Sequence, residues 1–157
     1  MANPDPLREH VLELLRMKSA HLSFDDAVAA FPAAMRGTKP KGAPHTPWQL
    51  LEHLRIAQWD ILDFSRNPAY REMKWPDEYW PKTEGPPDDD AWDKSVERFR
   101  QDLKSLEELI SDGSVDLTAR IAHGTGQTVL REALLVADHN SYHIGQLVLV
   151  RKVLEAK

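Results

Sequence analysis

The sequence predicts an all-α protein folded as a four-helix bundle. No run of four or more residues shows the strict alternation and hairpin turns typical of strands. All prolines lie at or before Pro87, so the second half of the chain is free to form long helices. Four segments carry apolar residues at spacings of three and four, the period of an amphipathic helix. A chain of 157 residues fits one domain, predicted over residues 1–157.

The N-terminal part is expected to contain one helix and one shorter helical segment. The first helix is predicted over residues 6–19, with its apolar face formed by Leu7, Val11, Leu14 and Leu15. Ser23 is a suitable N-cap for a short segment over residues 23–30, which ends near Pro32. The Pro/Gly-rich residues 37–44 then form a connecting loop.

A second long helix is expected over residues 47–66. Thr46 is a good N-cap and Pro47 suits the first helical position, while Asn67 and Pro68 stop the helix. The irregular run that follows, residues 68–87, is unusually long for a compact domain. Its aromatic residues favour packing over disorder, and they are Tyr70, Trp75, Tyr79 and Trp80.

The two remaining helices are predicted after this long aromatic loop. Asp88–Asp90 supply N-terminal capping and favourable charge for a helix reaching about Ser111. Its single apolar stripe consists of Trp92, Val96, Phe99, Leu103, Leu106 and Ile110. Asp112 and Gly113 end that helix, residues 113–126 form a turn region, and the last helix is expected over about residues 128–154.

Composition excludes several classes of function. The chain has 20 Lys and Arg against 25 Asp and Glu, a net charge of −5, which argues against nucleic acid and anionic membranes as partners. The longest stretch without these charged residues, 139–150, is too short to span a bilayer. The N-terminus lacks the basic start and apolar core of a secretion signal, so a cytoplasmic location is expected. Because cysteine is absent, any metal must be held by His, Asp or Glu.

The most informative residues are histidines on two of the long helices. His139 and His143 are four residues apart, so they project from one helix face and two imidazoles can share an ion. At about 100° per residue, that face also carries Leu135, Val136, Val150, Val153 and Leu154. His53 lies on the apolar face of the second long helix in the same way.

Two interpretations of these inward histidines stay open from spacing alone. In one, each imidazole is a core residue with its own hydrogen-bond partner, drawn from Asp60, Glu132, Gln49, Gln146 and Tyr142. In the other, His53, His139 and His143 share one ion and leave an open position for water. The other four histidines are interpreted as surface residues, although His45 and His123 adjoin helix starts where the mouth of a bundle would lie.

Three segments, residues 48–62, 75–81 and 128–147, together resemble the DinB-like (damage-inducible, YfiT-like) superfamily. The resemblance implies a four-helix bundle with a divalent metal, usually zinc or nickel, held at His53, His139 and His143. Some members of that superfamily are thiol-dependent S-transferases or isomerases. An ion on three neutral imidazoles acidifies a bound water, so hydrolysis of a small molecule is one use of such a site. The other, which the resemblance supports, is activation of a low-molecular-weight thiol.

Five further residues are candidates for roles around this site. Asp60 and Glu132 lie two turns from the histidines on the same helix faces, where each would orient a ligand or act as a general base; the alternative is a hydrogen-bonding cap at the end of the bundle. Trp80, Tyr142 and Gln146 are candidates for substrate binding, with packing as the alternative for the aromatic residues.

Second apolar faces on two helices predict a homodimer. They comprise Leu130, Leu134, Ala137, Ile144 and Val148 on the last helix and Trp48, Leu51 and Leu62 on the second long helix. The aromatic loop or the 23–36 segment would otherwise cover them within one chain. In function, the sequence favours an enzyme acting on a small molecule; the alternatives are a non-catalytic, stress-related binding protein with a structural ion, and a metal-free helical interaction module.

Overall fold

The computed structural model describes residues 5–156, so residues 1–4 of the segment used to argue against a secretion signal lie outside the described part. The described chain is all-α, and no strand occurs in it, which confirms the predicted fold class. Its helices are α1 (Pro6–Arg16), α2 (Phe24–Val28), α3 (Pro47–Arg66), α4 (Ala91–Ser111) and α5 (Val129–Glu155), with a 3-10 turn at Ala33–Met35. Within residues 5–156, no helix combines the length and apolar character that crossing a membrane requires.

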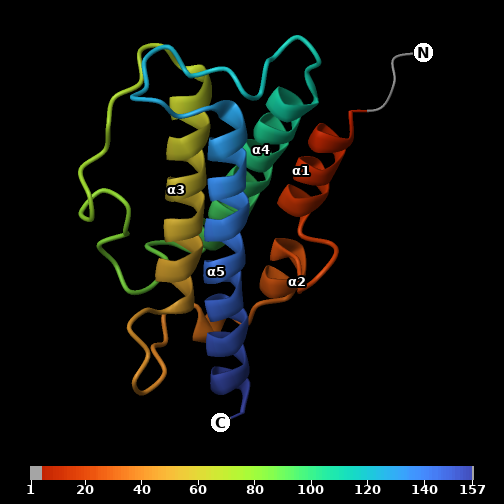
Figure 1. The fold of residues 1–157 in the computed structure, drawn as a ribbon. Helices are drawn as coiled ribbons and strands as arrows, with labels where there is room; N and C mark the ends of the chain where they lie inside the picture. The colour runs from red at the N-terminus through yellow and green to blue at the C-terminus, as the bar shows by residue number, and fades with distance from the viewer. Residues whose placement is uncertain (1–4, 157) are drawn as a thin grey trace.

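Helices α3 and α5 lie side by side and antiparallel at the front of the bundle (Figure 1). Helix α4 packs against α3, and α1 packs against both α4 and α5. The segment between α3 and α4 contains no helix and runs along the outer side of α3 (Figure 1). This arrangement places the long irregular segment beside the α3–α5 seam, where the inward histidines lie.

The start of α3 follows the prediction closely. The Thr46 hydroxyl accepts a hydrogen bond from the Gln49 backbone N–H at 3.2 Å, and the Gln49 side chain accepts one from the Thr46 N–H at 3.0 Å. This reciprocal pair is a capping box, which satisfies two backbone donors at the helix start. Thr128 caps α5 by accepting from the Arg131 N–H.

Helix α1 differs from the predicted N-terminal helix in its length and in the face that it buries. It ends at Arg16 rather than Ser19, because Met17 adopts the left-handed conformation with φ of 55°. Leu7 and Leu14 are exposed, although Val11 and Leu15 are buried as expected. The physical reason is Arg8, whose guanidinium turns inward. It donates to three backbone carbonyls: that of Ile110 at the end of α4 at 2.7 Å, and those of Asp112 at 2.9 Å and Val115, which follow α4.

The predicted end of the short helical segment and the predicted capping of α4 also differ in detail. Helix α2 ends at Val28 rather than Ala30, which takes a positive φ of 47°. Asp90 occupies the N-cap of α4, but its side chain makes no capping hydrogen bond and instead pairs with Lys94 at 3.4 Å. The charge of Asp90 still lies at the positive end of the helix dipole.

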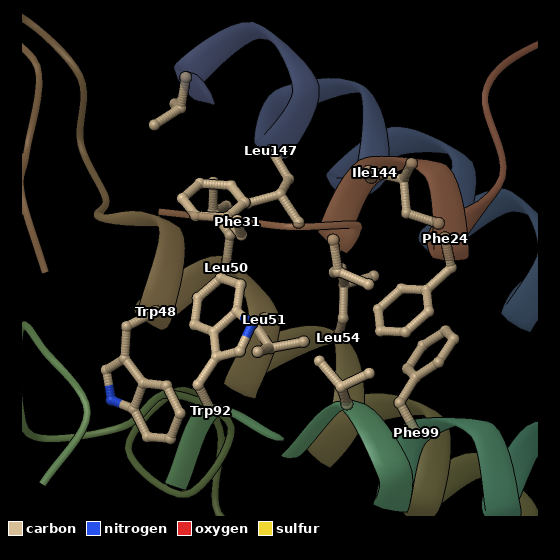
Figure 2. Close-up of a cluster of buried hydrophobic side chains, with 14 of the residues drawn as sticks. Phe24, Phe31, Trp48, Leu50, Leu51, Leu54, Trp92, Phe99, Ile144 and Leu147 are labelled. Atoms are coloured by element: carbon tan, nitrogen blue, oxygen red, sulfur yellow. The ribbon is translucent and has the colours of Figure 1, made fainter. Parts of the chain in front are cut away.

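The buried apolar residues form two clusters. The first joins α2 to the N-terminal halves of α3 and α4 and the C-terminal half of α5. In Figure 2, Phe24 of α2 and Phe99 of α4 face one another, and their ring centroids are 3.8 Å apart. The second cluster joins α1, the C-terminal ends of α3 and α4, the turn near Leu117 and the N-terminal half of α5.

The apolar faces that predicted a homodimer are largely covered within the chain. Trp48, Leu51 and Ile144 are buried in the first cluster together with Phe24 and Phe31 of the 23–36 segment. Coverage by that segment was the alternative explanation for these faces. The homodimer therefore stays a prediction, and these faces no longer support it.

A polar pair separates the two clusters. Gln58 of α3 donates through Nε2 to the Phe99 carbonyl of α4 at 2.8 Å, and its Oε1 accepts from Asn140 Nδ2 of α5 at 2.9 Å. Gln58 and Asn140 are both almost fully buried. One amide thus connects three helices across the centre of the bundle.

Replacing Gln58 with Leu is expected to lower the free energy of unfolding by about 2–6 kcal/mol, because it leaves two buried partners without their hydrogen bond at about 1–3 kcal/mol each. Urea denaturation measures this change. The matched control is Gln101→Leu, since Gln101 is an exposed amide on α4 that donates to Glu97, its one side-chain partner among residues 5–156. Equal stability of the two variants would contradict the connecting role of Gln58.

Candidate metal centre

The structure brings the three predicted histidines together at the α3–α5 seam. One ligand atom from each of His53, His139 and His143 lies within 4.8 Å of the others. The Nε2 atoms of His53 and His139 are 3.0 Å apart. His53 and His143 are buried and His139 is half-buried. The i, i+4 spacing on α5 and the antiparallel packing of α3 account for this convergence.

Hydrogen bonds at Nδ1 fix the tautomers of two of these rings. His53 Nδ1 lies 2.8 Å from the Tyr79 carbonyl oxygen, and His143 Nδ1 lies 2.7 Å from Gln146 Oε1. A carbonyl oxygen only accepts, so each Nδ1 carries the proton and donates it. The lone pair of each imidazole is therefore on Nε2. This is the arrangement found where a histidine ligates a metal and an outer group orients the ring.

All three imidazoles are neutral near pH 7. Burial is the largest cause that lowers the pKa of His53 to about 4 and the pKa of His139 to about 3. Burial also lowers the pKa of His143, against the opposing effect of its bond to Gln146. Neutral imidazole is the form that binds metal, so metal binding at this site needs no deprotonation step.

The donor set fits a divalent ion such as zinc or nickel, for which imidazole is a suitable ligand. Two nitrogens bound to one tetrahedral zinc at about 2.0–2.1 Å lie roughly 3.4 Å from each other, close to the observed separation of the His53 and His139 Nε2 atoms. His139 Nδ1 is buried and has no hydrogen-bond partner among residues 5–156, so this ring lacks the orienting partner that the other two have.

No fourth protein ligand joins the cluster within the described chain. Asp60 accepts hydrogen bonds from two tyrosines, and His123 Nε2 lies 2.7 Å from the Phe64 carbonyl oxygen. The two residues that sequence reasoning offered as a closing ligand are therefore engaged elsewhere. A site with three protein ligands is the type that keeps an open coordination position.

Trp80 lies against the cluster rather than at a free binding surface. Its indole stacks on the His53 ring with centroids 3.8 Å apart and planes 3° from parallel, and its opposite face stacks on His45 at 4.0 Å. Both faces are thus occupied by imidazoles, and a substrate can meet only the indole edge. The stacking holds the plane of His53 in place.

Tyr142 and Gln146, the other predicted substrate-binding residues, border the cluster on α5, and Trp75 approaches it from the loop. Tyr142 is 64 % exposed, and its ring centroid lies 4.8 Å from that of His143. Trp75 is 66 % exposed and approaches His53 from the loop, with centroids 6.4 Å apart. Gln146 forms a hydrogen bond with His143, one of the three candidate metal ligands. Each of these side chains thus lies next to one of the candidate ligands.

Asp60 acts on His53 through Tyr79. Its carboxylate accepts from the Tyr79 hydroxyl at 2.6 Å and from the Tyr70 hydroxyl at 3.0 Å. The main-chain carbonyl of the same Tyr79 accepts from His53 Nδ1. Burial raises the pKa of Asp60, whereas the two tyrosine hydrogen bonds lower it. Asp60 therefore holds the loop residue that orients a candidate ligand.

Glu132 lies apart from the cluster, in a polar cavity near the end of the bundle. It is only 3 % exposed, and its Oε1 pairs with Arg131 at 2.7 Å. The cavity has a volume of about 490 Å³ and is also lined by Asp60, Tyr70 and Glu72. The structure thus brings Asp60 and Glu132 to one cavity, and the predicted roles of base or orienter stay predictions.

Two contributors to the site were not identified from the sequence. The Tyr79 carbonyl gives no sequence signal, because every residue has one and the segment around it is irregular. His45 was noted for its place beside a helix start, but its stacking partner Trp80 lies 35 residues further along the chain and could not be deduced from spacing.

The chain is thus a helical bundle in which α3 and α5 direct three neutral histidines at one point. This arrangement is a candidate divalent-metal centre. The family model of the DinB superfamily matches residues 9–147, and the chain belongs to that superfamily. The resemblance seen in the sequence is thereby confirmed. No curated protein and no solved structure gives a significant match to this sequence.

Replacing Asp60 with Ala is expected to release the loop that carries Tyr79, because it removes two hydrogen bonds to a carboxylate, each worth about 1.5–3 kcal/mol. Proteolytic cleavage within residues 68–87 should accelerate at least about tenfold, since cleavage follows the population of the open form. The control is Asp63→Ala, whose carboxylate bonds Asn67 at the end of the same helix. Cleavage at the parental rate would show that Asp60 does not hold the loop.

Proposed function

We propose that this DinB superfamily protein binds one zinc or nickel ion through His53, His139 and His143 and uses it to catalyse a reaction of a small molecule. The observation that carries the proposal is the cluster of three neutral imidazoles with no fourth protein ligand in the described chain. Such a site supplies an acidic water or a bound thiolate at neutral pH when the ion is present. The activity class is a metal-dependent hydrolase or a low-molecular-weight-thiol S-transferase.

Residues of the chain provide the supporting parts of such a centre. Tyr79 and Gln146 keep the His53 and His143 rings in the tautomer that presents Nε2. Trp80 fixes the plane of His53 by stacking. Since the chain contains no cysteine, a thiol taking part in the reaction must arrive as a substrate.

The rival function is a non-catalytic binding protein whose ion is structural. A structural zinc site is normally closed by four protein ligands. Asp60 and His123, the two residues considered for that fourth position, have other hydrogen-bond partners. This difference favours catalysis.

The proposal also includes a cytoplasmic location, a small-molecule substrate, no binding of nucleic acid or membrane, and a homodimer. The net charge of −5 supports the exclusion of nucleic acid.

Protein purified without a histidine tag should contain about one divalent ion per chain by elemental analysis, and His143→Ala should lose it. Removal of the ion from the parent with a chelator should lower the free energy of unfolding by about 2.7 kcal/mol or more if the free ion had been at 100 times its dissociation constant. His10→Ala is the control, because His10 is an exposed histidine on α1. Equal metal content in the parent and His143→Ala would refute the assignment.

The open coordination position is testable with the cobalt-substituted protein. Its visible spectrum should change on addition of 2-mercaptoethanol, because an open position accepts an external ligand and changes the coordination of the ion. A closed structural site has no such position. A spectrum that stays constant up to a large excess of thiol, and of acetate in a parallel titration, would favour the structural ion.

A further inference from the structure

A second, smaller pocket adjoins the histidine cluster on the side opposite the polar cavity. It has a volume of about 270 Å³ and lies between the loop at residues 42–45 and the seam of α3 and α5. Its apolar walls are formed by Ala43, Pro44, Leu50, Leu149 and Val150. The sequence analysis did not single it out, because its walls come from three separate segments.

This pocket lies beside the histidine cluster, although none of the three histidines lines it. Gln146 lines it and bonds through Oε1 to His143 Nδ1 at 2.7 Å. Leu50, at its base, precedes His53 by three residues, which is less than one helical turn of about 5.4 Å. His45 also lines it and is separated from His53 only by the indole of Trp80. The pocket and the cluster are thus one side chain apart, Gln146 beside His143 and Trp80 beside His53.

The pocket lining selects for an uncharged group. It contains no Asp, Glu, Lys or Arg, and burial lowers the pKa of its single histidine, His45, which is therefore neutral at pH 7. The polar cavity beyond the cluster is different, since Asp60, Glu72, Arg131 and Glu132 line it. A dry apolar cavity of about 150 Å³ accepts benzene. The larger pocket has room for one substituted ring or a short alkyl chain.

We propose that this pocket binds the apolar arm of the substrate, an aromatic ring or a short alkyl chain, while the reacting polar group lies at the three histidines. The inference rests on the proposed function, because the histidines anchor the other end of the molecule. Leu149 supports it further: this leucine stands at the pocket 63 % exposed, so an apolar ligand would cover surface that the chain itself leaves in water.

The test uses zinc-loaded protein and a series of linear alkyl hydroxamates, from acetohydroxamate to octanohydroxamate, titrated by calorimetry. The hydroxamate group binds the ion and the chain probes the pocket. Affinity should rise about fourfold for each added methylene until the pocket is full. Leu149→Glu should weaken octanohydroxamate at least about tenfold and leave acetohydroxamate unchanged.

Two further variants locate the effect. Leu134→Glu is the matched control, because Leu134 is a leucine 44 % exposed on α5 that does not line the pocket, and the full series should bind it as it binds the parent. Ala43→Leu adds three carbons inside the pocket and should move the affinity maximum to chains about three carbons shorter. It tests the pocket from the loop, independently of any change in α5.

The outcomes separate this inference from the proposed function. Metal-dependent binding of acetohydroxamate with no gain along the series would overturn the apolar pocket and leave the metal centre standing. A gain that is unaffected by both Leu149→Glu and Ala43→Leu would place the chain elsewhere and also overturn the inference. Absence of any metal-dependent hydroxamate binding would overturn the metal centre and the pocket together.

Discussion

The register between α3 and α5 is the constraint on which the candidate site depends. It sets His53 opposite His139, with their Nε2 atoms 3.0 Å apart, and Gln58 opposite Asn140 at 2.9 Å. A slip of one turn would move each pair apart by about 5.4 Å. Apolar side chains tolerate such a slip better than buried amides, which lose their partners. The Phe99–Gln58–Asn140 connection therefore stabilises the register that the histidines need.

The same register gives the seam a polar end and an apolar end. On one side of the histidines, Asp60 of α3 and Glu132 of α5 border a cavity of about 490 Å³. On the other side, Leu50 and Val150 border a pocket of about 270 Å³ that lacks charged residues. Under the proposed function, a small molecule anchored at the histidines would meet two unlike surroundings. This asymmetry would give it a preferred orientation before any chemistry occurs.

Local rules and the family resemblance accounted for much of the fold and for the three histidines. The N-cap at Thr46 and the helical spacing along α4 are short-range patterns, so the sequence predicts them well. The inward turn of Arg8 depends on carbonyls more than a hundred residues away, and it exposes Leu7 against expectation. An apolar face shows that something covers it, but not whether the cover is α2 or a second chain. Contacts made by an irregular loop, such as the Tyr79 carbonyl, carry no periodic signal at all.

The loop between α3 and α4 belongs to the site rather than merely to its surroundings. Tyr79 is bound at both ends, its hydroxyl to Asp60 and its carbonyl to His53, and the next residue stacks on the same imidazole. The ordered loop and the correctly oriented His53 are therefore coupled. By reciprocity, a ligand that holds His53 Nε2 in place also favours the ordered loop, and loosening the loop weakens that ligand by the same factor. The contacts that the loop makes at the candidate site offset the conformational entropy lost when so long a loop is ordered.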